Sequence, residues 1–383
     1  MFRTKSYDVV VIGAGVFGSW TAWHLADQGR KVLLVDAHGP AHSRASSGGE
    51  SRIIRMGYGA DELYTRWSQQ SLPQWKKLFA AARQPLFEQT GVLWLAADTS
   101  RLQESARVLN KCGIPLEELN IAALSRRYPQ INFDEVQCGL LEPESGVLLA
   151  RRAVACVVAA ARKKGVEYHL RPILAPKACE KVRKVMSSNG EPITAGQVIF
   201  ACGPWLGKIF PEVLGERIFP TRQEVFFFGT PSGDASYRAA ALPTWLFEAD
   251  EAYGMPDIED RGLKLARDAH GELVDPDTQS RVASAEGIEW AKAYIARRFP
   301  GMRNAPLVET RVCQYENTST GDFLIDRHPE MENVWLAGGG SGHGFKHGPA
   351  FGEYVAKQVL GTGATESRFS LASKQTVQQR AVF

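Results

Sequence analysis

Three glycines near the N-terminus have the spacing of a phosphate-binding turn. Gly13, Gly15 and Gly18 fit the pattern G-x-G-x-x-G and directly follow the β-branched run Asp8–Ile12. In such a unit the first glycine permits a tight turn, the second lets the backbone approach a pyrophosphate, and the third lets a helix pack on a strand. The helix N-terminus offers free N–H groups and a positive dipole end to phosphates. The pattern therefore predicts a dinucleotide-binding site.

The residues after the glycines complete this unit. Ser19–Gln28 has the apolar spacing of a helix, and Gly29 suits the position just past its end. Lys31–Val35 reads as a second buried strand, and it leads into Asp36, whose carboxylate can accept hydrogen bonds from a ribose diol. A glycine motif alone is a weak signal, whereas this order of strand, helix, strand and acid is a strong one. The alternative is a tight turn in another kind of α/β protein.

Length, charge and cysteine usage exclude several classes of protein. The chain has 383 residues, a formal net charge of +3 and six cysteines. Its length predicts two or three domains, and its scattered basic residues argue against a nucleic-acid partner. We find no apolar run long enough to span a bilayer, and no signal peptide. The cysteines have neither C-x-x-C nor metal-ligand spacing, so we expect reduced thiols, no metal site and a cytoplasmic protein.

The alternation of helices and strands predicts an α/β fold, or α+β overall, and is interrupted twice. The interruptions contain segments with the pattern of antiparallel strands. We therefore predict a Rossmann-type nucleotide-binding domain with a discontinuous inserted substrate domain built on an antiparallel-rich sheet. The nucleotide-binding segments would be 1–84, 145–215 and 310–383, and the substrate segments 85–144 and 216–309. The polar end of the chain, from Thr365 to Phe383, is expected to be loosely held.

Four further motifs carry a resemblance to a known family. They are S-R-I-I-R at 51–55, G-L-K-L at 262–265, R-V-C-Q-Y at 311–315 and G-S-G-H-G-F-K at 340–346. Together with the N-terminal unit, and in this order, they resemble the monomeric sarcosine oxidase family of flavoprotein amine oxidases, which includes N-methyltryptophan oxidase. The resemblance covers nearly the whole chain. It implies FAD as cofactor and oxidation of a secondary amino acid by oxygen, giving an imine and hydrogen peroxide.

Cys313 is the residue through which the cofactor would be attached. The strand pattern places Arg311, Cys313 and Tyr315 on one face. The residues alone favour a buried structural thiol, whereas in the family that this chain resembles the matching cysteine is joined by a thioether to the 8α carbon of the flavin. Such a reaction needs a thiolate, and a nearby cation such as Arg311 would lower the thiol pKa. We therefore expect FAD to be covalently held through Cys313.

Lys264 would act on oxygen. Strand alternation puts Lys264, Ala266 and Asp268 on one face. The resemblance places Lys264 over the flavin, where a fixed cation would stabilise the negative charge that develops as oxygen is reduced. Without the resemblance, Lys264 would be interpreted as a surface lysine on an edge strand.

The resemblance also assigns a substrate site. Arg55 and Lys346 match a clamp on the substrate carboxylate, because an arginine fork can make two hydrogen bonds and a lysine adds a point charge. Tyr253 and Tyr315 match tyrosines that line the substrate cavity, although tyrosines at such spacing are more often core residues, and His343 is a further expected contact. Toward the flavin we expect, besides the N-terminal unit, Arg52, Cys313, Gly203, Gly340, Gly342, Gly344 and Lys346.

Asp268 departs from the family pattern. The family has a histidine four residues after the active lysine, and this chain has Asp268 there. The two-histidine loop before S-R-I-I-R is also absent, with Ser47 and Gly48 in its place. A second negative charge in a site built for a carboxylate disfavours sarcosine itself. It favours a substrate with an additional cation or hydroxyls, as in fructosyl amino acids.

Two other functions remain open at this point. The first is an FAD amine dehydrogenase that passes electrons to a partner, and Lys264 argues against it. The second is a non-enzymatic flavin-binding protein, and the retained cations Arg55 and Lys346 argue against that. We expect a small-molecule amine and oxygen as the partners, no nucleic acid, no membrane and a monomer.

Overall fold

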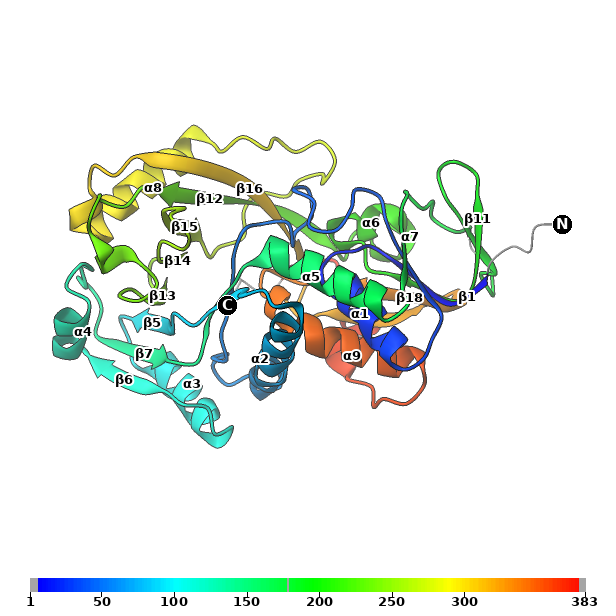
Figure 1. Cartoon of the computed structure of the whole chain (residues 1–383), viewed down its shortest axis with the longest axis horizontal. Coiled ribbons are helices and arrows are strands. Elements are labelled where there is room, and N and C mark those ends of the chain that lie inside the picture. The colour runs from blue at the N-terminus through cyan, green and yellow to red at the C-terminus, as the bar shows by residue number, and fades with distance from the viewer. Residues whose placement is uncertain (1–5, 178, 379–383) are drawn as a thin grey trace.

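The computed structural model describes residues 6–177 and 179–378, and within them the strands form two large sheets and a small one (Figure 1). The first large sheet has the order β17-β18-β11-β1-β2-β9, with β10 paired to β11. Its central strands are parallel, whereas β10 and β17 pair antiparallel with their neighbours. The strands are β1 (Ser6–Ile12), β2 (Val32–Asp36), β9 (Glu167–Leu170), β10 (Lys184–Met186), β11 (Pro192–Phe200), β17 (Leu324–His328) and β18 (Met331–Gly338).

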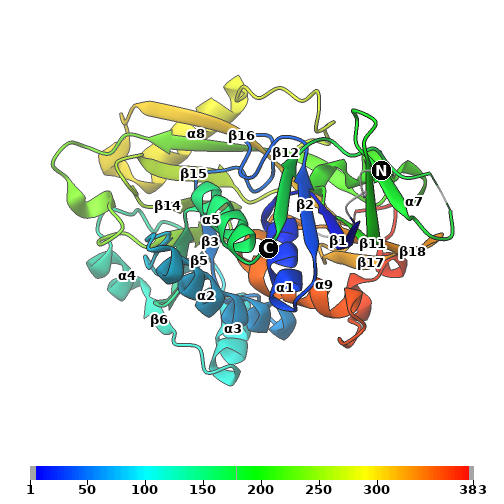
Figure 2. The ribbon, with the colours of Figure 1, turned by 45° about the vertical axis from the view of Figure 1, so that its right-hand side comes forward.

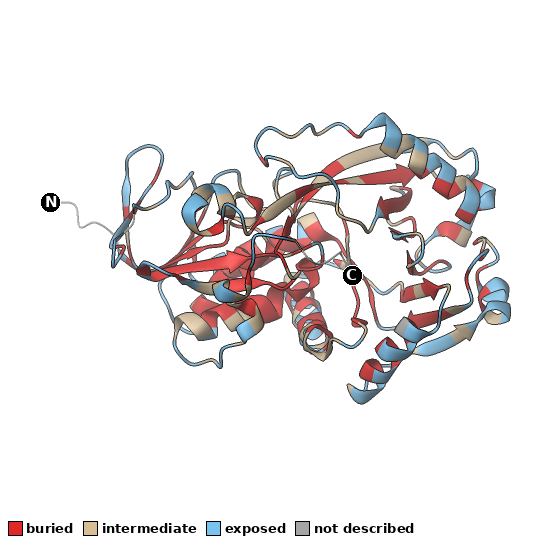
Figure 3. Ribbon diagram, turned by 180° about the vertical axis from the view of Figure 1, so that it is seen from behind, coloured by how far each residue is buried: buried red, intermediate tan, exposed pale blue. Residues whose placement is uncertain are grey.

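Both faces of this sheet are buried, and successive residues of β1 pack on opposite faces. Val9 and Val11 pack into one hydrophobic cluster, and Val10 and Ile12 pack into another on the opposite face. A near-continuous apolar run is typical of a parallel strand covered on both sides. Buried residues are accordingly concentrated in these strands and in the helices beside them (Figure 3). These helices are α1 (Val16–Asp27), α2 (Glu62–Ala82), α5 (Ala150–Lys163) and α9 (Gly348–Val359).

The second large sheet has the order β16-β12-β15-β14-β13-β5-β7-β6 among the described residues (Figure 1), and Figure 2 shows β14, β15 and β16 of this sheet from another direction. All of its pairings are antiparallel except that of β5 with β13. Its strands are β5 (Val92–Ala96), β6 (Glu117–Asn120), β7 (Cys138–Glu142), β12 (Phe219–Phe228), β13 (Thr244–Phe247), β14 (Ala252–Met255), β15 (Leu263–Arg267) and β16 (Leu307–Asn317). The predicted fold class, with an antiparallel-rich second sheet, is confirmed.

The remaining elements are short or flank the second sheet. The small sheet joins β3 (Arg52–Ile54), β8 (Gly146–Leu148) and β4 (Phe87–Glu88). The flanking helices are α3 (Ser100–Lys111), α4 (Ile121–Arg127) and α8 (Ala285–Arg298), and two four-residue helices follow β11, namely α6 (Leu206–Ile209) and α7 (Pro211–Leu214). Within the described ranges, no helix combines the length and apolar character that a membrane span needs.

The chain after α9 differs from the expectation of a loosely held tail. Phe369 is fully buried, and its ring packs with those of Tyr64 and Trp67. The Arg368 guanidinium pairs with the carboxylates of Asp61 and Asp322 at 2.6 Å. The prediction is therefore wrong for residues 365–378, because one aromatic side chain and one arginine anchor this segment; residues 379–383 lie outside the described part of the chain.

Candidate active site

A cavity of about 330 Å³ lies at the carboxyl ends of β1, β2 and β11. This is the edge of a parallel sheet at which nucleotides bind. Gly13 adopts a φ of +107°, and a Cβ there would lie 2.2 Å from the carbonyl oxygen of Ala201. A Cβ on Gly18 would lie 1.9 Å from the Gly13 oxygen. Only glycines let the turn and the start of α1 pack this closely, which leaves the N-terminus of α1 facing the cavity.

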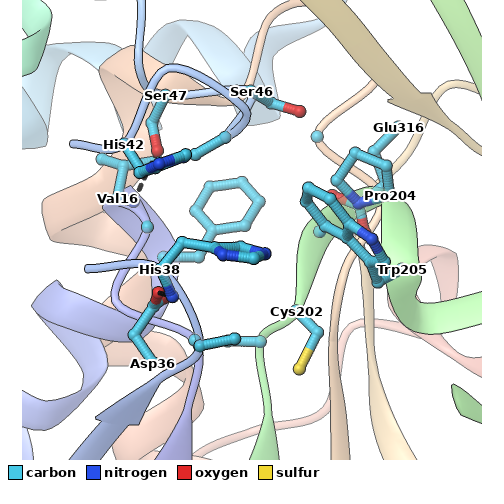
Figure 4. Close-up of a pocket in the computed structure, with 18 of the residues that line it drawn as sticks. Val16, Asp36, His38, His42, Ser46, Ser47, Cys202, Pro204, Trp205 and Glu316 are labelled. Atoms are coloured by element: carbon cyan, nitrogen blue, oxygen red, sulfur yellow. Dashed lines mark hydrogen bonds between the residues drawn. The ribbon is translucent and has the colours of Figure 1, made fainter. Parts of the chain in front are cut away.

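Asp36 organises the adjacent wall of the cavity (Figure 4). Its carboxylate accepts hydrogen bonds from the backbone N–H groups of Ala14, His38 and Gly39, each at 2.7 Å. A carboxylate has about four acceptor positions. Asp36 therefore holds the glycine turn and the loop after β2 in place, and retains acceptor capacity for a ligand hydroxyl.

Cys313 lies beside Arg52 near the other end of the cavity, which Arg52 and Tyr315 line. The Arg52 guanidinium donates to the Cys313 Sγ at 3.2 Å and to the carbonyl oxygen of Ser46 at 2.8 Å. Arg311 pairs instead with Glu309 and, at 3.3 Å, with Glu50. Arg311, given above as an example of a nearby cation, therefore does not contact the thiol in the hydrogen bonds of the described residues. Two carboxylates draw its side chain away, and Arg52 from β3 occupies that position.

Lys264 is buried in the interior of the second sheet. It lies on β15, between β12 and β14, so it is not on an edge strand. Its side chain amine donates to the carbonyl and hydroxyl oxygens of Ser51, at 2.9 and 3.2 Å. Burial, followed by the nearby charge of Arg52, lowers the pKa of Lys264 well below its ordinary value. A negative charge placed near this amine would favour its protonated, positively charged form.

Arg55 and Lys346 form a pair of buried cations. Each residue is 3% exposed. The Lys346 amine donates to the Tyr58 hydroxyl at 2.7 Å and to the carbonyl oxygen of His343 at 2.9 Å. The Arg55 guanidinium lies 4.3 Å from the Tyr58 ring centroid and 4.6 Å from that of Trp94. Burial and the charge of Arg55 lower the pKa of Lys346 well below its usual range. Two adjacent buried cations make a site that an anion would stabilise.

Asp268 lies one residue beyond β15, close enough to both cations to interact with their charges. Burial raises the pKa of its carboxyl to about 7, while Arg55 and Lys346 act in the opposite direction. Burial also raises the pKa of Tyr253 to about 12, and that of Tyr315 well above its ordinary value; the Asp268 charge adds to both shifts. The structure thus brings Asp268 and both tyrosines into one group with the cations.

His343 contacts this group through its carbonyl oxygen, which accepts from Lys346, and through Tyr58. One ring nitrogen is 3.2 Å from the Tyr58 hydroxyl, the other is 3.0 Å from the carbonyl oxygen of Gly321, and the ring stacks on Phe323. These contacts let His343 orient Tyr58, and through it Lys346. They give no support to a direct contact of its ring with a substrate.

Comparison with known proteins identifies the family. Residues 8–358 match the family described as DAO: FAD dependent oxidoreductase. The chain belongs to this family of FAD-dependent oxidoreductases. The enzyme is 32% identical over 376 residues to the monomeric sarcosine oxidase of Bacillus sp. (strain B-0618), which covers 96% of this chain and 95% of the relative. It is 30% identical over 366 residues to the N-methyl-L-tryptophan oxidase of Salmonella arizonae, covering 92% and 95%. The predicted family, cofactor and enzyme class are confirmed.

Solved structures share the fold of this FAD-dependent oxidoreductase. The L-proline dehydrogenase of P. horikoshii superposes with a TM-score of 0.81 at 22% identity, covering 94% of this chain and 95% of the other. The fructosamine oxidase of Aspergillus fumigatus also has a TM-score of 0.81, at 20% identity, covering 96% and 90%. At these identities the likeness concerns the fold alone.

The residues around the large cavity of the oxidoreductase fit FAD. The N-terminus of α1 and Asp36 suit the pyrophosphate and the ribose. On the same side of the cavity as Asp36, the His38 ring points toward Trp205 on the opposite side, with ring centroids 6.2 Å apart (Figure 4). The predicted glycines Gly15, Gly203, Gly340, Gly342 and Gly344 all line the same cavity.

Glu316 is a cavity residue of the oxidoreductase that sequence reasoning missed. It is 5% exposed, and its Oε1 has no hydrogen-bond partner among the described residues. Burial raises the pKa of its carboxyl to about 7, and the backbone N–H groups of Gly339 and Gly340 act to lower it. An unpartnered buried polar atom facing a cofactor cavity is suited to a ligand hydroxyl. The feature of the sequence that could have pointed to Glu316 is its position directly after the motif R-V-C-Q-Y.

Glu142 and Tyr58 were missed as well. The Glu142 carboxylate accepts from the backbone N–H groups of Met56 and Gly57, at 2.6 and 3.0 Å, and from the Trp94 indole at 2.8 Å and the Ser145 hydroxyl at 2.7 Å. Glu142 thereby fixes the segment after Arg55, and it also fixes the Trp94 ring against which the Arg55 guanidinium lies. No local pattern marks either residue, because the partners that place them in the site, such as Met56 for Glu142 and Lys346 for Tyr58, are far away in the sequence.

Proposed function

We propose that this FAD-dependent oxidoreductase oxidises an N-substituted or cyclic amino acid with oxygen, giving an imine and hydrogen peroxide. The observation that carries the proposal is the buried pair Arg55 and Lys346, which offers a carboxylate two cations away from solvent. The names of the relatives, sarcosine oxidase and N-methyl-L-tryptophan oxidase, support the same class of substrate.

Each residue of the site has a separate task in this proposal. FAD, when bound, supplies the acceptor for two electrons from the substrate C–H bond. Arg55 and Lys346 hold the substrate carboxylate and so orient the C–N bond, while Tyr253 and Tyr315 close the cavity against water. Lys264 stabilises negative charge that develops on oxygen. We also propose that Cys313 is the covalent attachment point, activated by the Arg52 guanidinium 3.2 Å from its sulfur.

Asp268 favours a second candidate substrate class, the glycated amino acids. A carboxyl with a pKa of about 7 beside the carboxylate clamp can donate a hydrogen bond when neutral, and can pair with a cation when ionised. Sugar hydroxyls or a second ammonium group on the substrate would use either form. Sarcosine has neither feature, so we expect it to be a poor substrate.

The organisation of the molecule is part of the proposal. We infer FAD-binding segments 1–84, 145–215 and 310–383 and substrate segments 85–144 and 216–309, supported by the division of most strands between the two large sheets. We further propose a monomer in the cytoplasm, with oxygen rather than a protein as the electron acceptor. Six free cysteines agree with a reducing compartment.

The test is an anaerobic screen of the purified holoenzyme. We expect N-methyl, cyclic or glycated amino acids to bleach the flavin absorbance, and air to restore it with release of hydrogen peroxide. Arg55→Ala should weaken substrate binding by about 2–5 kcal/mol, because a carboxylate loses a desolvated cation. Bleaching that is unaffected by Arg55→Ala would remove the clamp from the mechanism, and recovery that needs a protein acceptor would favour the dehydrogenase.

A further inference from the structure

A second cavity, of about 50 Å³, lies beside Lys264. Among the described residues that line the two cavities, none is common to both. Lys264 and Ser51, which are joined by two hydrogen bonds, form its inner wall. This space is therefore separate from the cofactor cavity and reaches the buried lysine from another side.

The outer end of this second cavity is close to solvent. Arg152 and Glu259 line it and form an ion pair at 2.6 Å, and their side chains are 50% and 57% exposed. Ion pairs between exposed side chains contribute little stability, so such a pair is easily opened. The cavity thus extends from a weakly closed surface opening to the Lys264 amine.

The walls between the two ends combine apolar side chains with the charged Glu50 and Arg261. Leu149, Phe227, Met255 and Ile258 all line this part, and the first three are at most 5% exposed. A site needs roughly 10–15 Å³ of this kind of volume to hold one water molecule. The cavity therefore admits a few molecules of that size and excludes an amino acid. A small apolar gas makes no strong hydrogen bonds with water, so it loses none on entering such a space.

We propose that this second cavity is the route by which dioxygen reaches Lys264 from solvent. The proposal rests on the role given above to Lys264 as the cation beside which oxygen is reduced. A separate route means that oxygen does not pass the carboxylate clamp of Arg55 and Lys346. Oxygen can then reach Lys264 while the oxidised product still occupies the clamp.

Ile258 is the position at which to narrow the route. It is partly exposed and lies outside any strand or helix, so a larger ring can be accommodated there with less strain than at a fully buried wall residue. Ile258→Trp and the smaller Ile258→Phe should narrow the cavity in graded steps, and Ile258→Val is the matched control. Flavin content and the unfolding midpoint of each holoenzyme verify that it is folded.

The measurement is reoxidation of photoreduced holoenzyme after rapid mixing with oxygenated buffer, which requires no knowledge of the substrate. We expect the second-order rate constant to fall several-fold in Ile258→Trp, less in Ile258→Phe and not in Ile258→Val. Reoxidation by ferricyanide should be equal in all four proteins. Equal rate constants with oxygen for folded Ile258→Trp and the parent would overturn the route.

A parallel variant distinguishes this failure from failure of the proposed function. If Lys264→Met slows the reaction with oxygen and Ile258→Trp does not, the oxidase stands and the route is wrong. If the photoreduced parent does not react with oxygen, both the oxidase and the route are wrong.

Discussion

At the scale of single residues, Lys264 shows how burial makes the protonation of an amine sensitive to nearby charges. Its amine is held by Ser51, and its pKa is lowered well below the ordinary value by burial and by Arg52. A nearby anion would shift its equilibrium back toward the charged form. The amine therefore responds to the appearance of negative charge on a neighbouring molecule.

Replacement of this lysine should affect only the oxidative half of the reaction. We expect Lys264→Met to slow flavin reoxidation by oxygen about a hundred- to a thousand-fold, by analogy with the loss of one donor to a developing anion. Anaerobic reduction by substrate should be nearly unchanged. Stopped-flow absorbance measures both rates, and Lys264→Arg should recover part of the loss. Equal reoxidation in Lys264→Met and the parent would contradict the role.

Asp268 predicts a pH dependence of ligand binding. Since its pKa is about 7, the carboxyl is neutral below that pH and ionised above it. A simple carboxylate ligand on Arg55 and Lys346 should therefore bind more weakly as the pH rises through 7. Loss of charge from Lys346, whose pKa is also lowered, acts in the same direction. Asp268→Asn removes the contribution of Asp268 ionisation and leaves that of Lys346.

The measurement is the dissociation constant of acetate, followed by perturbation of the flavin spectrum between pH 6 and 8. We expect Asp268→Asn to flatten the dependence, leaving the part due to Lys346. The exposed Asp260 provides the control Asp260→Asn, which should resemble the parent. A parent curve that is flat across this interval would show that Asp268 does not interact with the bound carboxylate.

As a test of substrate preference, Asp268→His should improve turnover of sarcosine relative to the parent.

Cys313 gives a chemical prediction. We expect the flavin of the parent to stay with the protein after acid precipitation and that of Cys313→Ser to be released into the supernatant, because serine cannot form the thioether. Cys202, which lines the same cavity, is the matched control, and Cys202→Ser should retain its flavin. Complete release from the parent would disprove the covalent link without affecting the oxidase.

At the scale of elements, the end of β7 holds the segment that follows β3. Glu142 is 1% exposed, and its two oxygens accept from the four donors described above. A glutamine would present an amide to at least one of these donors and leave it unpaired, at a cost of about 1–3 kcal/mol. The segment after Arg55 should then lose its fixed position.

We therefore expect Glu142→Gln to lower the unfolding free energy by about that amount, and to weaken acetate binding more than binding of a neutral ligand such as acetamide. Denaturant titration and flavin difference spectra measure the two effects. The exposed Glu144, two residues away, provides the control Glu144→Gln. A stability loss with unchanged acetate binding would mean that Glu142 supports the fold but does not position Arg55.

At the scale of the whole molecule, the cofactor cavity joins segments that are far apart in the sequence. The turn at Gly13, the loop at Ser46, the turn at Gly203 and the strand at Tyr315 all line it. A ligand that binds only this folded arrangement stabilises it in proportion to its affinity and concentration. FAD should therefore stabilise the chain as one unit.

Cys313→Ser allows this to be measured, because its flavin is expected to be removable. We expect FAD at about one hundred times its Kd to raise the unfolding free energy of the flavin-free variant by about 2.7 kcal/mol. Calorimetry with and without added FAD checks the shift, and riboflavin tests whether the pyrophosphate contributes. An unfolding midpoint that is independent of FAD would contradict binding in this cavity.

The sequence alone determined the parts that depend on neighbours along the chain. The tight turn at Gly13 and the acid at Asp36 follow from spacing and local conformation. Strand β14 escaped prediction because it contains Gly254, whose place there is set by another strand: a Cβ would lie 2.1 Å from the Trp245 ring. The family motifs also predicted most of the residues that the structure brings together here, because the order of the motifs along the chain carries information.

Tertiary structure decided which charges meet. Arg311 and Cys313 share a strand face, yet the thiol lies beside Arg52, because side chains several ångströms long turn toward the nearest opposite charge. Glu142 meets the segment after Arg55 across 86 residues of sequence, and no local pattern records such a contact. The tail is anchored through Phe369 for the same reason. The Phe369 ring packs against Trp67 of α2 and against Phe323, which directly precedes β17, and only the folded chain brings these residues together.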